Sequence, residues 1–289
     1  MSLQEILHSG QLAVTTEVIP PKGTDLSKFL AGIRHVRGLV HAVDVADHPR
    51  AVARMSNLAM AHLVSEAGCD PILVLTCRDH NVLGLQGTIL GVNALGIENV
   101  MCVHGDPPAG GDHPKASGVY EVSTTKLISM VRGLAAGADL AGNSLHGTPR
   151  IFVGAGADPG CDSLAHEVAY MERKVAAGAQ FFQTQSVYDL DTFARFRAAT
   201  RHLAVPVLAG IFLVESATLA RRINTTMRGC HIPEWLIQKL DDSPKPLETM
   251  AETAVELARG LATLADGVHI MSLNRLEVVA RVIRGAGLA

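Results

Sequence analysis

Residues 71–104 read PILVLTCRDHNVLGLQGTILGVNALGIENVMCVH, and this stretch decides the fold class. Two short apolar runs, Pro71–Cys77 and Asn99–His104, flank a helical stretch at Val82–Leu95. Both runs are continuously apolar rather than alternating, which is typical of parallel strands buried on both faces. Parallel neighbours need a long crossover connection, usually a helix. The stretch therefore predicts a strand–helix–strand unit of a parallel sheet.

The same alternation recurs along the whole chain. Short apolar or β-branched runs are bounded by Gly, Pro, Asn or Asp, and helical-period stretches separate them. The predicted strands are Leu12–Ile19, Val40–Ala46, Pro71–Cys77, Asn99–His104, Arg150–Gly154, Gln180–Gln185, Pro206–Leu213 and Gly267–Leu273. The predicted helices are Leu26–Val36, Arg54–Ala67, Val82–Leu95, Ser123–Ala136, Ser163–Ala177, Leu190–Leu203, Ser216–Ile223 and Leu247–Leu264.

Eight strand–helix units in 289 residues predict an α/β fold, a (β/α)8 TIM barrel, as a single domain over residues 1–289. The extra length, Met227–Pro246, predicts a short helical insertion at about residues 225–246. A doubly wound open sheet is the alternative. No G-x-G-x-x-G follows the first predicted strand and no Walker motif is present, so the usual nucleotide-binding sequences of open sheets are missing.

Composition argues against several classes of partner. The chain has 25 Lys and Arg against 28 Asp and Glu, with no basic cluster, so we expect no nucleic acid partner. No apolar run reaches the roughly 18 to 20 residues of a membrane span, and the first residues lack the features of a signal peptide. We therefore expect a cytoplasmic protein with no membrane partner.

Neither cysteine nor histidine spacing indicates a metal or a disulfide framework. The five cysteines are widely separated and form no Cys-x-x-Cys pair, so we expect free thiols. The 13 histidines include no His-x-x-x-His pair, so we expect no metal site.

Polar residues stand where the predicted strands end, which in a parallel barrel is the mouth that carries the active site. The main candidates are Glu17, Asp106, Gln185 and Arg275. Each also has a structural explanation. Glu17 is either a partner in a salt bridge or an acid whose pKa burial raises. Asp106 suits a Gly-Asp-Pro turn. Gln185 could form hydrogen bonds with backbone groups inside the barrel, and Arg275 could form an ion pair at a strand end.

Five linked motifs resemble the methylenetetrahydrofolate reductase family in their order over nearly the whole chain. They are TTEVIPPKGTD (15–25), LTCRDHNVLGLQGTILGVNALGIENVMCVHGDPP (75–108), ERKVAAGAQFFQTQSVYDLDTFARF (172–196), VPVLAGIFLVES (205–216) and MSLNRLEV (271–278). The family is a flavin-dependent barrel. It passes a hydride from NADH or NADPH through FAD to 5,10-methylenetetrahydrofolate, which gives 5-methyltetrahydrofolate.

The resemblance implies a role for each motif residue. Glu17 is similar to the general acid that protonates N10 of the substrate and opens its imidazolidine ring. Asp106 is similar to a catalytic carboxylate that binds the pterin and tunes the flavin, while Gln185 and Arg275 are similar to folate-binding residues. The positions that resemble FAD-binding ones are His104, Gly105, Asp106, Glu167, Arg173 and Lys174. The resemblance also implies a homo-oligomer.

The departures from the family pattern fall mainly on the flavin side. His104 stands where the family usually has Arg, Val74 where many members have His, and Ala46 where the family has Thr. The family has a tyrosine that covers the flavin, and its position falls in the run from Gly154 to Gly156, where this chain has no tyrosine. Three alternatives therefore stay open: direct hydride transfer from NAD(P)H without flavin, a non-catalytic folate-binding subunit, and a barrel enzyme for another pterin.

Overall fold

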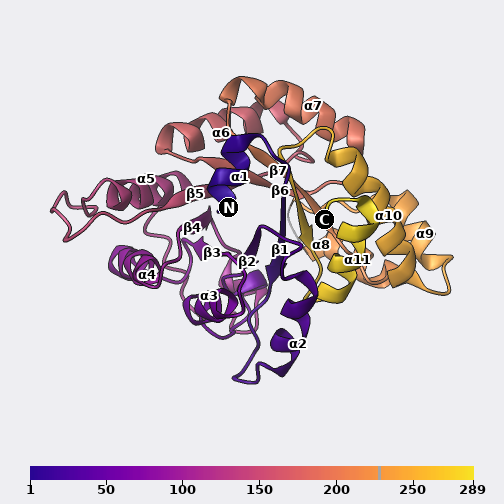
Figure 1. The fold of residues 1–289 in the computed structure, drawn as a ribbon, viewed down its shortest axis with the longest axis horizontal. Coiled ribbons are helices and arrows are strands. Elements are labelled where there is room, and N and C mark those ends of the chain that lie inside the picture. The colour runs from indigo at the N-terminus through magenta and orange to yellow at the C-terminus, as the bar shows by residue number, and fades with distance from the viewer. Residues whose placement is uncertain (227–228) are drawn as a thin grey trace.

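Eight parallel strands close into a barrel in the computed structural model, which describes residues 1–226 and 229–289 (Figure 1). Each strand pairs with the next along the chain, and β8 pairs with β1 to close the ring. The strands are β1 (Ala13–Val18), β2 (Ala42–Val45), β3 (Pro71–Thr76), β4 (Asn99–Val103), β5 (Phe152–Ala157), β6 (Phe181–Ser186), β7 (Val207–Phe212) and β8 (Gly267–Met271). The predicted TIM barrel is confirmed, and the open sheet is wrong.

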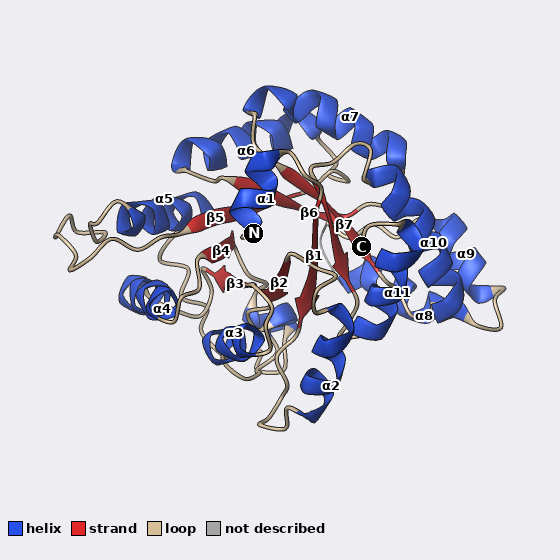
Figure 2. Cartoon of the chain, in the orientation of Figure 1, coloured by secondary structure: helices blue, strands red, loops and turns tan. Residues whose placement is uncertain are grey.

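Helices surround the barrel (Figure 2). They are α1 (Leu3–Ser9), α2 (Ser27–Val36), α3 (Asn57–Glu66), α4 (Val82–Ala94), α5 (Thr124–Ala135), α6 (Leu164–Ala177), α7 (Leu190–Thr200), α8 (Ala217–Thr226), α9 (Glu234–Asp241), α10 (Pro246–Leu261) and α11 (Leu276–Ala286). Each predicted helix has its counterpart. Asn81, Ser123 and Ser163 cap α4, α5 and α6 by accepting a backbone N–H with their side chains. Within the described residues, none of these helices combines the length and apolar character of a membrane span.

Two helices were not predicted from the sequence. The seven-residue α1 is too short to show a clear helical period, and its formation depends on burial of Leu3, Ile6 and Leu7 against the barrel interior. Figure 1 shows α1 lying across one end of the barrel. The last helix, α11, packs against α10 and α2.

Strand β5 lies further along the chain than predicted, at Phe152–Ala157 rather than Arg150–Gly154. Its Gly- and Ala-rich end has low β-propensity, so the sequence did not mark where it stops. Gly154 is required by packing, because a Cβ there would lie 2.2 Å from the ring of Phe181. In the stretch where we expect the insertion, α9 occupies Glu234–Asp241, and residues 227–228 lie outside the described residues.

Candidate active site

Glu17 occupies the mouth end of β1, where its side chain is half-buried. Burial raises the pKa of Glu17 from its ordinary 4.5 to about 7. Among the described residues no ion pair involves Glu17, so the salt-bridge explanation finds no support there. An acid with this pKa is about half protonated near neutral pH and can donate a proton.

Beside Glu17, polar side chains fill one layer of the barrel interior. Asp44 is the Cα partner of Glu17 on the neighbouring strand, and its Oδ1 accepts a hydrogen bond of 2.9 Å from Nε2 of Gln183. The Nδ1 of His269 bonds to Oγ1 of Thr15 at 2.9 Å and lies 3.9 Å from Oδ1 of Asp44. Burial raises the pKa of Asp44 well above its ordinary value and lowers that of His269 to about 4, so the imidazole of His269 is neutral near pH 7. Glu17 therefore stands next to a buried layer of hydrogen-bonded polar side chains.

Asp106 lies in the loop after β4. Gly105 has φ +87°, and a Cβ there would meet Thr76 at 2.9 Å, so this turn requires glycine. The Asp106 carboxylate accepts a hydrogen bond of 3.0 Å from the backbone N–H of Arg50. His104, two residues before Asp106, stacks on Tyr120 with ring centroids 4.8 Å apart.

Three of the residues expected to bind a cofactor line one cavity of about 280 Å³ at the ends of β4, β5 and β6. His104, Glu167 and Lys174 line it together with Gln185 and Asp158. Arg173 is not part of this lining. Its side chain is exposed on α6, 5.1 Å from the ring centre of Tyr170.

Arg275 follows β8 and forms an ion pair with Glu215, which follows the neighbouring strand β7, with Nε 2.7 Å from the carboxylate. Both residues line a cavity of about 520 Å³ with Lys28 and Phe29 of α2. The loop is held in place by Asn274, whose side-chain amide exchanges two hydrogen bonds with the backbone of Ile19. The described structure thus pairs Arg275 with a carboxylate that a bound anion would have to displace.

The structure also reveals polar groups that sequence reasoning did not connect. Asp44 and His269 form the polar layer beside Glu17, and only their inward positions on β2 and β8 could have indicated this. Asp47, His48 and Asp79 form the one group of three possible metal ligands within the described part of the chain. Both carboxylates are already engaged, since Asp47 accepts two bonds from Thr76 and Asp79 pairs with Arg78. This group therefore ties loops together rather than offering free ligands.

A closed parallel barrel with an acid of raised pKa and further polar groups at the carboxyl ends of its strands has the architecture of a TIM-barrel enzyme. A profile of the family "Methylenetetrahydrofolate reductase" matches residues 2–287. The chain belongs to this family, as the five motifs indicated.

Curated relatives agree with this assignment. "5,10-methylenetetrahydrofolate reductase" of Escherichia coli (strain K12) is 24% identical and aligns with 99% of this chain and 94% of its own length. "Methylenetetrahydrofolate reductase (NADH) 1" of Zea mays is 25% identical over 98% of the chain, and "Probable methylenetetrahydrofolate reductase (NADPH)" of Caenorhabditis elegans is 22% identical over 99%. The chain spans about half the length of these last two relatives.

Solved structures share the fold. EDTA monooxygenase from Chelativorans sp. BNC1 superimposes with a TM-score of 0.56 at 12% identity, over 95% of this chain and 92% of its own. Tryptophan synthase from M. tuberculosis does so with a TM-score of 0.53 at 12% identity, over 98% and 97%. These likenesses concern the barrel alone.

The cavity beside Lys174 does not fit FAD as its residues stand. Pockets for drug-sized ligands usually span about 300–1,000 Å³, and this one, at about 280 Å³, would enclose only part of an FAD molecule. The Lys174 ammonium already donates to the Gly156 carbonyl at 2.7 Å, lies 4.0 Å from Glu167 and sits over the ring of Tyr170. Burial lowers its pKa to about 8. With Asp158 also in the lining, the cavity presents two carboxylates where a pyrophosphate would need positive charge.

Proposed function

We propose that this chain interconverts 5,10-methylenetetrahydrofolate and 5-methyltetrahydrofolate, with NADH or NADPH as the hydride donor. The proposal rests mainly on Glu17, a half-buried carboxyl group at the barrel mouth. Burial raises the pKa of this group to about 7. Membership of the reductase family supports the substrate and the nicotinamide donor. The alternative of a non-catalytic folate-binding subunit is disfavoured, because a binding protein has no need of a proton donor kept at this pKa.

In the reductive direction, Glu17 gives its proton to N10 of the substrate. The bond between N10 and the methylene carbon breaks, and the electron pair of that bond stays on N10. The positive charge that results is shared between N5 and the methylene carbon. A hydride then reaches that carbon, which becomes the methyl group. The balance is one proton from Glu17 and one hydride from NAD(P)H, and Glu17 regains a proton from solvent.

The polar layer beside Glu17 supports this role. The imidazole of His269 is neutral near pH 7, so no adjacent imidazolium lowers the pKa of Glu17, and burial also disfavours the charged form of Asp44. Asp106, Gln185 and Arg275 are proposed to bind the substrate. Asp106 and Gln185 are exposed at the mouth, and Arg275 lines the largest of the cavities described above.

For the path of the hydride, the cavity geometry favours direct transfer from NAD(P)H over a shuttle through FAD. This preference rests on two observations. The ammonium of Lys174 already has partners within the protein, and two carboxylates line the same cavity. A Cβ on Gly156 would meet no described atom within 4 Å, so the space beside this position, where the family pattern has a tyrosine over the flavin, is open in the described part of the chain. We therefore assign no step to FAD.

The test starts with the visible absorption spectrum of the freshly purified protein, before and after FAD is added and the excess removed. The protein is then mixed with NADH or NADPH and 5,10-methylenetetrahydrofolate, and 5-methyltetrahydrofolate is quantified by chromatography. We expect a colourless protein that forms the product. Retained flavin bands that bleach with NADH or NADPH would contradict direct transfer and support the shuttle. Absence of product under both conditions would contradict the proposed activity.

Homo-oligomerisation, implied by the resemblance, and a cytoplasmic location remain predictions. Light scattering of the purified chain and fractionation of the source cells test them.

A further inference from the structure

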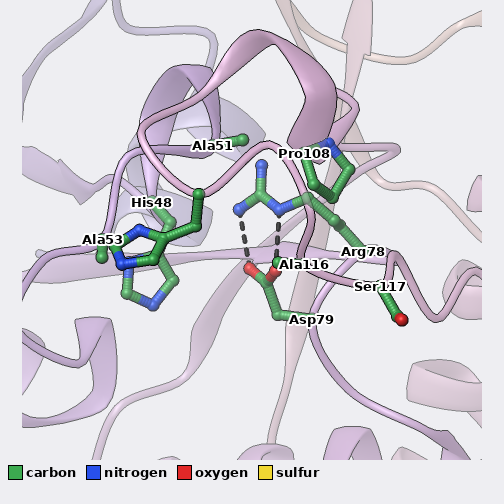
Figure 3. Close-up of a pocket in the computed structure, with 9 residues that line it drawn as sticks. His48, Ala51, Ala53, Arg78, Asp79, Pro108, Ala116 and Ser117 are labelled. Atoms are coloured by element: carbon green, nitrogen blue, oxygen red, sulfur yellow. Dashed lines mark hydrogen bonds and ion pairs between the residues drawn. The ribbon is translucent and has the colours of Figure 1, made fainter.

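Arg78 is a permanent cation buried beneath the loops of the barrel mouth. Its side chain is only 2% exposed, and Figure 3 shows its guanidinium paired with the carboxylate of Asp79. Nε lies 2.7 Å from Oδ1 of Asp79, and Nη2 lies 2.6 Å from Oδ2. This bidentate geometry fixes the plane of the guanidinium. The function proposed above gives Arg78 no role.

The same guanidinium binds the backbone of two further loops. Nη2 donates to the carbonyl oxygen of Asp47, after β2, and Nη1 donates to the carbonyl oxygen of Asp106, after β4, both at 3.2 Å. Asp79 itself follows β3. One side chain thus joins the loops after three consecutive strands. Four of its five N–H groups are used within the protein, so Arg78 is poorly placed to act as a ligand for substrate.

The segment that follows Asp106 returns to Arg78. The N–H of Val119 donates to the Arg78 carbonyl at 2.7 Å, and the N–H of Tyr120 donates to the carbonyl of Cys77 at 3.0 Å. The Tyr120 hydroxyl donates to the carbonyl of Asp106 at 3.2 Å. Residues 106–120 therefore form a closed loop whose two ends both meet at Arg78.

Asp106 is held on its carboxylate side by the N–H of Arg50, which belongs to a strained segment. His48, Arg50 and Ala51 all have positive φ angles, of 42°, 58° and 54°. Such strain persists only where surrounding contacts impose it. Beside these residues lies a cavity of about 310 Å³, lined by His48, Ala51, Pro108 and Ala116. The loop after β4 thus has free space on the side of this cavity, while further along it Asp112 accepts a hydrogen bond of 3.0 Å from the N–H of Ala53.

We propose that Arg78 is a positioning residue for Asp106, which it fixes through the main chain rather than by touching the substrate. This inference rests on the proposed function, because it assigns Arg78 to the pterin side of that site. Arg78 holds the Asp106 carbonyl, and the N–H of Arg50 holds the carboxylate, so the two contacts together restrain the orientation of the Asp106 side chain. Without the guanidinium the loop can move into the neighbouring cavity, and a shift of about 1 Å in a site costs about 10²-fold in rate.

The test compares Arg78→Gln, Arg78→Lys and the double variant Arg78→Gln/Asp79→Asn, with Arg281→Gln as the control. Arg281 forms an exposed ion pair with Glu248. Arg78→Gln leaves Asp79 without its partner and is expected to lose stability as well as activity. The double variant removes both charges, so it is expected to recover the denaturation midpoint but not the activity.

We expect kcat/KM for 5,10-methylenetetrahydrofolate to fall about 10²-fold in all three Arg78 variants, while KM for NAD(P)H stays unchanged. Arg78→Lys is not expected to restore activity, because a single ammonium group cannot bind one carboxylate and two carbonyl groups at once. Hydrogen exchange gives a readout independent of catalysis. The amides of Arg50, Val119 and Tyr120 should exchange faster in the double variant, while those of β6 and β7 should not change.

Recovery of activity in the double variant would overturn the proposal, because Arg78 would then only neutralise Asp79. Unchanged exchange at Arg50, Val119 and Tyr120 in that variant would overturn it as well. If the wild-type chain does not reduce the substrate, the proposed function fails. The exchange experiment still decides whether Arg78 holds the loop.

Discussion

Glu17→Gln is expected to lower activity and raise stability in the same molecule. Removal of a general acid usually costs about 10²–10⁴-fold in rate, so kcat in the reductive direction should fall within that range. The stability effect follows from the pKa of Glu17, which is about 7 in the folded chain against an ordinary 4.5. Between these two values the folded state binds a proton that the unfolded state has lost, so rising pH destabilises the wild-type fold.

The size of the effect can be worked from the same values. Its upper bound is roughly 3 kcal/mol, reached above pH 7 and absent below pH 4.5. Between pH 5 and pH 8 the variant should therefore gain roughly 2–3 kcal/mol relative to the wild type. Urea denaturation at both pH values measures this difference. Glu252→Gln, on the exposed side of α10, is the matched control and should show no pH-dependent gain.

Two results would refute this reasoning. If Glu17→Gln changes stability equally at pH 5 and pH 8, then burial does not raise the pKa of Glu17. If the variant keeps the wild-type kcat, Glu17 is not the proton donor. In the wild type, reductive kcat should fall as pH rises through about 7, because only the protonated acid can donate.

Three further predictions concern other parts of the barrel. Gly154→Ala places a Cβ 2.2 Å from the ring of Phe181 and should cost about 1–3 kcal/mol in urea denaturation, whereas Gly156→Ala, with nothing within 4 Å, should be nearly neutral. Arg275→Met should raise KM for the folate about tenfold without changing KM for NAD(P)H, and an equal rise in both would contradict a folate-binding role. His269→Asn should make the protein less sensitive to acid. The lowered pKa of His269, about 4, means that the wild type loses stability as pH falls from 6.5 to 4, and parallel acid titrations by circular dichroism test this.

Much of the fold was predictable because its signals are local. Each strand is a short apolar run and each crossover helix has its own period, so one unit such as Pro71–Val103 can be recognised without its neighbours. Elements whose stability depends on distant contacts gave weaker signals. The short helix α1 forms because Leu3, Ile6 and Leu7 close the end of the barrel.

For the candidate site too, the sequence could place some residues, whereas other contacts were visible only in the structure. Glu17, Asp106, Gln185 and Arg275 could be assigned to the mouth because parallel strands in a barrel all end at the same edge. The hydrogen bond from Gln183 to Asp44 joins residues that lie 139 positions apart, and no local pattern predicts it.

By itself, then, the sequence determined the barrel and the set of polar residues at its mouth, since strand periodicity and strand ends are properties of short segments. Only the tertiary structure decided the state of those residues. It pairs Arg275 with Glu215, turns Lys174 inward to Gly156 and connects Arg78 to three loops. It also leaves Glu17 half-buried with a raised pKa. The physical reason is that solvation and ion pairing depend on distances between groups that are far apart in the chain.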